Sequence, residues 1–139
     1  MEKATDEGGE KKLTTAEIGE EGEWVAAKFL YLRAGYKVLR KNYRAPKGGE
    51  VDLVCRNGDV LAFVEVKTRT SEDFGRPIDA VDDKKRRLIA KGALHWLRQL
   101  NHPNINFRFD VVEVLLVDGE KPRVNLVRGA FELPEPLLY

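Results

Sequence analysis

The chain has 139 residues, of which 42% are hydrophobic, so it is long enough for one domain with a single core and too short for two. Its 24 lysines and arginines nearly balance 23 aspartates and glutamates, so attraction to a polyanion would have to come from a local basic face. The single cysteine, Cys55, excludes an intramolecular disulfide, and the absence of a long apolar run predicts a cytoplasmic protein without a membrane segment.

The N-terminal part of the chain divides into a tail and a helix. Residues 1–12 are charged and carry hardly any apolar group, so we expect a disordered tail there and a single domain over residues 13–139. Thr14 and Glu17 fit a capping box, which predicts a helix that begins here and ends near Gly35. Its apolar positions at helical spacing are Ile18, Gly22, Val25, Phe29 and Leu32.

Three strands are predicted after this helix. Residues 36–44 form the first, and residues 50–55 and 60–68 are rich in β-branched side chains. Asn57 and Gly58 separate the last two and are typical of a two-residue hairpin turn. We therefore place this hairpin at the centre of the sheet.

The C-terminal half contributes a long helix and two strands. Asp79 is expected to cap the helix, and residues 104–117 and 123–127 are expected to be strands. The apolar side of the helix is Ile89, Ala93, Trp96 and Leu100. The predicted fold is therefore α/β, with the order αβββαββ.

The hairpin turn determines which side chains share a face of the sheet. If Asn57 and Gly58 form the loop, Glu50 lies directly opposite Glu65. Alternation of side chains then gives one face the residues Glu50, Asp52, Phe63, Glu65 and Lys67. The other face is apolar and is expected to belong to the core, with Val51, Leu53, Cys55, Ala62, Val64 and Val66.

The carboxylates on the first face would repel one another. Two carboxylates separated by about 5 Å repel by roughly 3 kcal/mol at an effective dielectric constant of about 20, more than one exposed lysine returns. A divalent cation would offset this repulsion, and Mg²⁺ suits two carboxylates completed by water and phosphate oxygens. We predict a Mg²⁺ (or Mn²⁺) site with Asp52, Glu65 and the Val66 carbonyl as ligands, beside which Lys67 would hold or polarise a water.

The alternative interpretation is that these residues are solvated acids on an exposed sheet face. For an isolated Glu-x-Lys pattern this alternative is the better one. Here the segments GEVD and FVEVK occur together as the two strands of one hairpin, with the turn between them, so the metal site is the preferred interpretation.

These residues resemble a known family. The segments that carry the resemblance are Gly22–Ala26, Gly49–Leu53, Phe63–Arg69, Phe74 with Gly75, Lys85 and Arg108–Val112. They are similar to the YraN-type family of the PD-(D/E)xK, or restriction-endonuclease-like, superfamily, although Val51 stands where the superfamily pattern has proline. The resemblance implies a three-layer α/β/α domain with a mixed sheet, like that of Holliday-junction resolvases. It also implies an endonuclease, in a family with no settled substrate. Together with the predicted metal site, this leads us to expect a magnesium-dependent endonuclease that acts on DNA, with branched or structured DNA as the preferred substrate class.

Two further residues are assigned to the site. Glu23 is followed by Ala26, Ala27 and Leu30 at helical spacing, which turns it toward the sheet as a supporting ligand or water-positioning residue. Lys85 shares the apolar side of its helix with Ile89 and is expected to reach the acids, where it and Glu50 would support the site.

Nucleic-acid contacts are expected from basic residues at the edge of this site. Arg69 follows the lysine of the active strand and is the best candidate for a phosphate contact. The outer side of the long helix carries Lys84, Arg87 and Lys91. The preferred interpretation of this side is a solvated helix face, and the alternative is a surface that contacts successive phosphates.

Other residues are assigned outside the site. Trp24 and Trp96 are interpreted as packing residues, and Asp110 is expected to pair either near Arg108 or with Lys67.

Two alternative functions stay open: a non-catalytic nucleic-acid-binding or protein-interaction module, and an adaptor whose acidic face binds a basic partner. A junction resolvase needs two sites related by two-fold symmetry, so a homodimer is expected if that analogy holds.

Overall fold

In the computed structural model the described residues are 5–6, 9–10, 12–71, 81–101 and 104–134. The elements are β1 (Thr5–Asp6), β2 (Gly9–Glu10), α1 (Thr15–Arg33), β3 (Lys37–Arg44), β4 (Glu50–Asn57), β5 (Val60–Arg69), α2 (Asp83–Arg98), β6 (Asn106–Leu115) and β7 (Arg123–Phe131). From α1 onward the order is αβββαββ, so the predicted α/β fold is confirmed. Within the described part of the chain, β1 and β2 pair with each other and with no strand of the main sheet. Most of the expected N-terminal tail lies outside the described residues.

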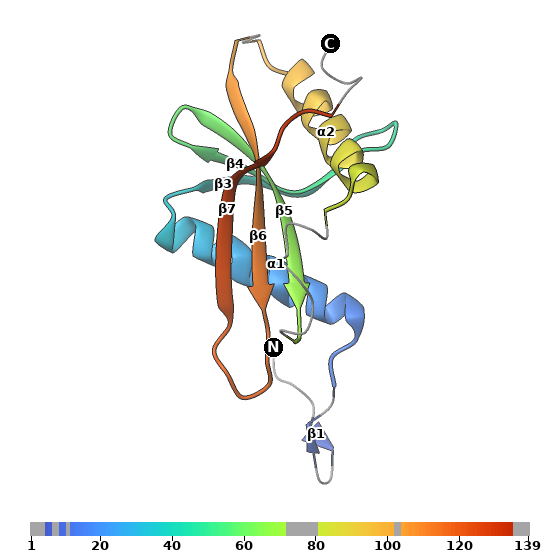
Figure 1. The fold of residues 1–139 in the computed structure, drawn as a ribbon, viewed down its shortest axis with the longest axis vertical. Helices are drawn as coiled ribbons and strands as arrows, with labels where there is room; N and C mark the ends of the chain where they lie inside the picture. Colours follow the sequence, from blue (N-terminus) through green and yellow to red (C-terminus); the bar gives the residue numbers. More distant parts are fainter. Residues whose placement is uncertain (1–4, 7–8, 11, 72–80, 102–103, 135–139) are drawn as a thin grey trace.

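The main sheet is five-stranded, in the order β3-β4-β5-β6-β7. β5 and β6 run parallel, whereas the other neighbouring strands are antiparallel, so the sheet is mixed. The hairpin of β4 and β5 occupies its centre, as predicted (Figure 1). The parallel step from β5 to β6 needs a crossover connection, and α2 lies within it.

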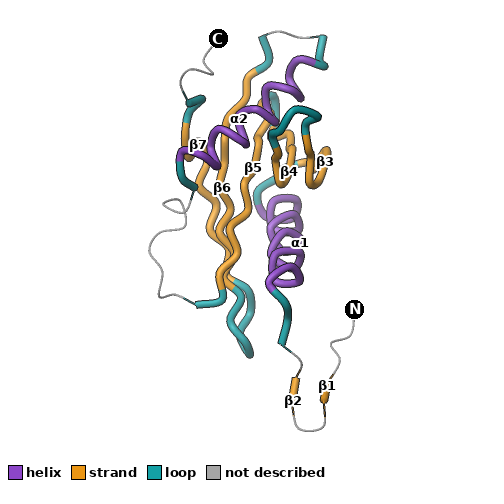
Figure 2. Tube along the Cα trace, turned by 90° about the vertical axis from the view of Figure 1, so that its right-hand side faces the viewer, coloured by secondary structure: helices purple, strands orange, loops and turns teal. Residues whose placement is uncertain are grey.

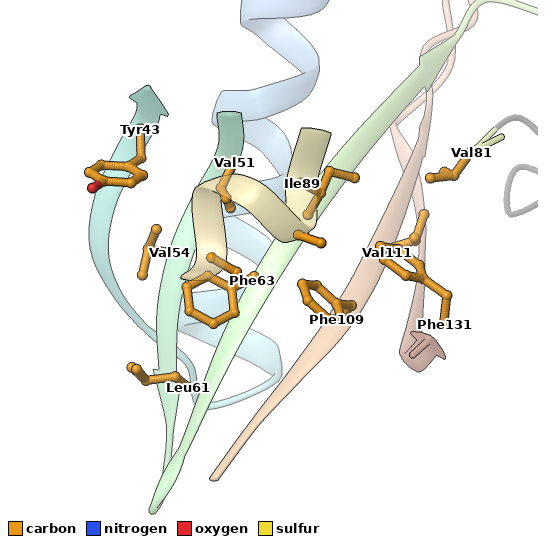
Figure 3. Close-up of a cluster of buried hydrophobic side chains, with 12 residues drawn as sticks. Tyr43, Val51, Val54, Leu61, Phe63, Val81, Ile89, Phe109, Val111 and Phe131 are labelled. Atoms are coloured by element: carbon orange, nitrogen blue, oxygen red, sulfur yellow. The ribbon is translucent and has the colours of Figure 1, made fainter. Parts of the chain in front are cut away.

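The two helices cover opposite faces of the sheet. Leu61 and Phe63 of β5 pack in a cluster with Ile89 of α2 (Figure 3), whereas the alternating residues Ala62 and Val64 pack in a second cluster with α1. Figure 2 shows α1 lying to one side of the strands. The architecture therefore has three layers, α/β/α. Among the described residues, neither helix has both the length and the apolar character that crossing a bilayer requires.

Helix α1 begins as predicted and turns most of its predicted residues toward the sheet. Thr14 is its N-cap and forms the capping box with Glu17. The buried residues are Gly22, Ala26, Ala27 and Leu30. Leu32 is 60% exposed and Trp24 is 58% exposed, so the assignment of Leu32 to the buried face and of Trp24 to packing was wrong. Gly22 and the two alanines of this stripe let the helix backbone approach the sheet closely.

Helix α2 begins later than predicted. Its N-cap is Asp82, whose side chain accepts a hydrogen bond from the Lys85 backbone N–H at 2.9 Å. Asp79, the expected cap, lies outside the described residues. Ile89 and Ala93 are buried as predicted, and Trp96 and Leu100 are partly buried against the same cluster. The basic residues on the outer side, Lys84, Arg87, Lys91 and Arg98, are exposed.

The hairpin differs in register from the prediction. Asn57 pairs with Val60, so the loop consists of Gly58 and Asp59, and Glu50 does not lie opposite Glu65. Gly58 has φ +64° at the first loop position, a conformation that favours glycine. The pairing is displaced by two residues, and because side chains alternate with a period of two, the residues of β5 keep their predicted faces.

Val51 is the exception to the predicted faces. It belongs to the cluster beneath α2, together with Val54, and not to the cluster of Leu53 and Cys55. The pairing of β4 with β5 ends at Leu53 and Val64, so the first residues of β4 are free of that ladder. Gly92 of α2 packs directly on this segment, since a Cβ at that position would lie 3.0 Å from Val51 Cγ2.

Candidate active site

The candidate site lies where β4 and β5 separate. The β4–β5 ladder ends at the pair Leu53 and Val64. Asp52 and Glu65 are the next residues on the two strands beyond this pair, on the side away from the turn. Glu23 reaches the same region from α1, and Lys85 reaches it from the first turn of α2. Three layers of the fold therefore contribute to one cluster of charged side chains.

Glu65 is the most confined member of the cluster. Its side chain is 3% exposed, and its Oε2 lies 3.5 Å from Lys67 Nζ and 3.7 Å from Lys85 Nζ. Its Oε1 is buried and meets no hydrogen-bond donor among the described residues. Burial, and then the neighbouring carboxylate of Asp52, raise the pKa of Glu65 to about 8 despite the two lysines. An additional cation would be favoured beside this carboxyl group.

Asp52 is held against β5 by a backbone contact. Its Oδ2 accepts a hydrogen bond of 2.8 Å from the backbone N–H of Val66, the residue after Glu65. This bond joins the two strands beyond the end of their ladder. It keeps two carboxyl groups side by side, an arrangement that costs free energy unless positive charge compensates for it.

Lys85 links Glu50 to Glu65. Its Nζ donates to Glu50 Oε1 at 2.7 Å, and Arg44 Nη1 lies 3.6 Å from Glu50 Oε2. The hydrogen bond from Lys85 lowers the pKa of Glu50. Burial by itself lowers the pKa of Lys85, but the hydrogen bond to Glu50 and the charge of Glu65 outweigh it and raise that pKa. The expectation that Lys85 points inward to the acids agrees with this geometry.

Glu23 is half-buried next to this pair of carboxyl groups. Burial, and then the charge of Asp52, raise the pKa of Glu23, whereas a hydrogen bond from Asn42 lowers it. Asn42, at φ +51°, is the only described residue other than glycine with a positive φ. Asn42 was not among the predicted site residues. The available signal was an asparagine inside a strand pattern, since asparagine tolerates this conformation better than most residues.

The expected nucleic-acid-binding residues lie on α2 and at the end of β5. Lys84, Arg87 and Lys91 are exposed on the outer side of α2. Arg69, at the end of β5, lines a hollow with Glu113 of β6 and Arg123 of β7. Their contact with nucleic acid stays a prediction.

Asp110 does not belong to the candidate site. It is fully buried and accepts hydrogen bonds from Tyr36 Oη at 2.5 Å, Arg108 Nε at 2.9 Å and the Gly129 backbone N–H at 2.9 Å. Of its two expected partners, Arg108 is therefore the one observed, and Lys67 lies beside Glu65 instead.

Asp52 and Glu65 offer two carboxylate ligands to a small, hard cation. Within the described ranges, no group of three or more His, Cys, Asp or Glu side chains is arranged around a common metal position. A cation here would therefore take Asp52 and Glu65 and complete its shell with backbone oxygen, water or substrate. Mg²⁺ accepts such a shell, since it commonly keeps several waters and binds through one or two carboxylates. The donorless oxygen of Glu65 is consistent with this arrangement.

Comparison with known proteins identifies relatives along most of the chain. A UPF0102 protein of Geobacter sulfurreducens is 42% identical over 116 residues, which cover 84% of this chain and 89% of the relative. A UPF0102 protein of Trichlorobacter lovleyi is 43% identical over 117 residues, covering 84% and 91%. One from Rhodococcus opacus is 41% identical over 114 residues, covering 82% and 95%.

The family model described as "Uncharacterised protein family UPF0102" matches residues 22–114. This span includes Glu23, Asp52, Glu65 and Lys85, and it extends from α1 into β6. The predicted resemblance is confirmed at the level of the family: the chain belongs to the uncharacterised protein family UPF0102.

Proposed function

We propose that this protein is a metal-dependent endonuclease that hydrolyses phosphodiester bonds in DNA. The observation that carries the proposal is the Glu65 carboxyl group, which is buried beside Asp52, lies within 4 Å of two lysines and keeps one oxygen without a donor. A carboxyl pair of this kind, held near a lysine where β4 and β5 separate, is suited to a divalent ion and an attacking water.

Each residue has a distinct part in this proposal. Asp52 and Glu65 would hold Mg²⁺ or Mn²⁺, with the Val66 carbonyl as a third ligand. The bound ion would supply Lewis acidity toward a phosphate oxygen and toward water. Lys67 would orient the attacking water, and Glu23 would accept a hydrogen bond from a water on the α1 side. Lys85 and Glu50 would position Glu65, because Lys85 contacts both of these carboxylates.

The order αβββαββ with a mixed five-stranded sheet supports placing the chain in the restriction-endonuclease-like superfamily. The placement and the resemblance to junction resolvases favour DNA, in branched or structured form, as the substrate. Phosphates would contact Arg69 and the outer stripe of α2 formed by Lys84, Arg87 and Lys91. Cleavage of a junction on two strands would require a homodimer.

A second candidate is a module that binds nucleic acid or protein without cleaving it. The arrangement of only two carboxylates, with no third metal-ligating side chain among the described residues, favours this alternative. The two candidates differ in one measurable property, because only the nuclease needs a divalent ion at Asp52 and Glu65.

Thermal unfolding with and without divalent ions tests the metal site. Ligand-linked stability is RT ln(1 + [L]/Kd), so 10 mM Mg²⁺ at a Kd of about 1 mM would stabilise the wild type by about 1.4 kcal/mol. Asp52→Asn should lose most of this gain, whereas Lys67→Met should keep it. Glu120→Gln, an exposed acid in the β6–β7 connection, is the matched control and should behave as the wild type. No gain with either Mg²⁺ or Mn²⁺ would contradict the metal site.

A cleavage panel tests the chemistry. Labelled linear, nicked, flapped and four-way DNAs, with RNA as a comparison, are incubated with wild type and variants in Mg²⁺ or Mn²⁺. We expect cleavage by the wild type, a reduction of at least about 100-fold in Lys67→Met, and none in EDTA. Ion-dependent stabilisation without cleavage of any substrate would favour the binding module.

A further inference from the structure

Two large aromatic side chains are exposed on the same side of α1. Trp24 is 58% exposed and Tyr31 is 67% exposed, and they lie seven residues apart, about two helical turns. Lys28, between them, places its Nζ 5.0 Å from the centre of the Trp24 ring. Exposed aromatic rings of this size with a lysine between them are unusual for a surface that only meets water.

These side chains line one wall of a groove between α1 and the edge strand β3. The lining residues are Trp24, Ala27, Lys28, Tyr31, Lys37, Val38 and Lys41. Three of the seven are lysines, and none of the seven is acidic. The groove therefore combines flat apolar rings with concentrated positive charge, although the whole chain has a net charge of only +1.

This combination matches one class of occupant better than others. Proteins that bind single-stranded nucleic acid stack bases on aromatic rings and track phosphates with a basic groove. A second copy of this chain is a poorer match, because a two-fold interface brings the same patch against itself and would oppose lysine to lysine. Lysines on an exposed edge strand also disfavour pairing with another strand.

The groove lies near the candidate active site. Glu23 immediately precedes Trp24, and Lys41 is close enough to act on the charge of Glu23. Lys41 also pairs with Leu53, the neighbour of Asp52, across the β3–β4 ladder. A strand that lies along the groove would thus pass near Glu23.

We infer that the groove between α1 and β3 binds a single-stranded segment of DNA, with bases stacked on Trp24 and Tyr31 and phosphates paired with Lys28, Lys37 and Lys41. Delivery of that strand to Asp52 and Glu65 rests on the proposed function, but the binding itself does not. The substrate class would then be DNA with a single-stranded part, such as a flap or a branch.

Binding can be measured without chemistry. A fluorescein-labelled 20-nucleotide oligo-dT is titrated with protein in EDTA at low salt, and anisotropy gives Kd. Loss of one stacked base costs about 1–3 kcal/mol, so Trp24→Ala and Tyr31→Ala should each weaken binding about 5- to 150-fold. Lys28→Gln and Lys41→Gln should each weaken binding and reduce the salt slope by about 0.7.

Matched controls separate stacking and charge from general surface effects. Leu32→Ala removes an exposed apolar side chain of α1 that does not line the groove, and Lys121→Gln removes an exposed lysine far along the chain. Both should bind oligo-dT as the wild type does. In Trp96→Phe, Trp24 is the only tryptophan, and its fluorescence should be quenched by oligo-dT.

Three results would count against single-stranded DNA as the occupant of the groove. Wild-type protein that does not bind oligo-dT, or a Trp24→Ala variant that binds within twofold of wild type, would overturn the inference. A dimer that dissociates in Trp24→Ala, with DNA binding unchanged, would assign the groove to a second copy instead. Failure of the nuclease proposal has a different signature: Trp24-dependent binding would persist in EDTA, while no ion stabilises the protein and no DNA is cut.

Discussion

Glu65 is the residue on which the chemistry of the candidate site depends. Its carboxyl group is nearly inaccessible, it adjoins another carboxyl group, and its two lysine neighbours lie at 3.5 Å and 3.7 Å rather than in full hydrogen-bond contact. The lysines therefore compensate the negative charge only in part. Without a metal ion, the group is more easily protonated than an ordinary glutamate.

This protonation predicts a pH dependence of stability in metal-free protein. The pKa of Glu65 is about 8 in the folded state against an ordinary value of 4.5. Between these values the folded state holds a proton that the unfolded state has lost, so the free energy of unfolding should fall as pH rises from about 4.5 to about 8. The slope is at most about 1.4 kcal/mol per pH unit for one group. Chemical denaturation in EDTA at pH 5, 6, 7 and 8 measures it.

The matched variants assign the slope to this residue. Glu65→Gln cannot ionise and should show a flatter profile, gaining at least about 2 kcal/mol relative to wild type between pH 5 and pH 8. Glu120→Gln removes an exposed glutamate and should follow the wild type. Parallel profiles for wild type and Glu65→Gln would mean that Glu65 stays ionised in the fold.

At the scale of elements, one close contact places α1 over the active strand. A Cβ added at Gly22 would lie 1.8 Å from Thr68 Oγ1, so only glycine fits where the helix crosses β5. The next residue is Glu23, whose approach to Asp52 depends on this crossing. Gly19, almost one turn earlier, faces open space, since a Cβ there would have no neighbouring atom within 4 Å, and it serves as an internal comparison.

Alanine at these two glycines should therefore have opposite effects. Gly22→Ala forces the helix away from the strand and should destabilise the protein by about 1–3 kcal/mol. Gly19→Ala keeps all contacts and improves helix propensity, so it should stabilise the protein by about 0.5–1 kcal/mol. Urea denaturation measures both. Thr68→Ala should restore part of the stability lost in Gly22→Ala, because it removes the nearest clashing atom; an equal loss in both glycine variants would refute this account.

The elements show what local sequence determines. The capping box at Thr14 and the strands around the hairpin depend on neighbouring residues, and both were predictable. The register of the hairpin was not, because Asn57 with Gly58 and Gly58 with Asp59 both satisfy turn chemistry, and tertiary packing selects between them. Most of the buried face of α1 was predictable, including Gly22 and Ala26, whereas Leu32, at the end of the apolar spacing, is exposed.

In the candidate site, too, features set by local sequence were predictable and features set by tertiary packing were not. The proximity of Asp52 to Glu65 was predictable from the hairpin, but alternation alone does not account for it, because Val51 and Leu53, on either side of Asp52, pack in opposite clusters. The contribution of Asn42 was not, since it depends on a positive φ at a position that reads as regular strand. The exposure of Trp24 was also beyond sequence reasoning, because a tryptophan at helical spacing is most often buried.

At the scale of the whole molecule, the central strands carry two separate clusters. The cluster beneath α1 contains Cys55, Ala62 and Val64, and the cluster beneath α2 contains Leu61 and Phe63. Since alternate residues of one strand serve both clusters, a local opening on one face should disturb the other. We therefore expect the five-stranded sheet to unfold as one cooperative unit.

A buried polar network supports the same unit. Tyr36, which precedes β3, donates a hydrogen bond to Asp110 of β6, and Arg128 of β7 donates to Tyr36 at 3.2 Å. Tyr36→Phe would remove the hydroxyl and leave the fully buried Asp110 with one donor fewer. We expect a loss of about 1–3 kcal/mol in the free energy of unfolding, measured by urea denaturation. Tyr31→Phe, an exposed tyrosine on α1, is the control and should change little.

Cys55 provides a direct test of cooperative unfolding. Its side chain is fully buried in the cluster beneath α1, and burial raises the pKa of its thiol to about 12, so the reactive thiolate is scarce in the folded protein at neutral pH. Labelling by a thiol reagent should therefore require global unfolding, with a dependence on urea that matches the equilibrium m-value. An accessible thiol, from Asp59→Cys combined with Cys55→Ala, should react at once in native protein. Labelling of Cys55 with a much weaker urea dependence would reveal local opening of the α1 face and contradict a single cooperative sheet.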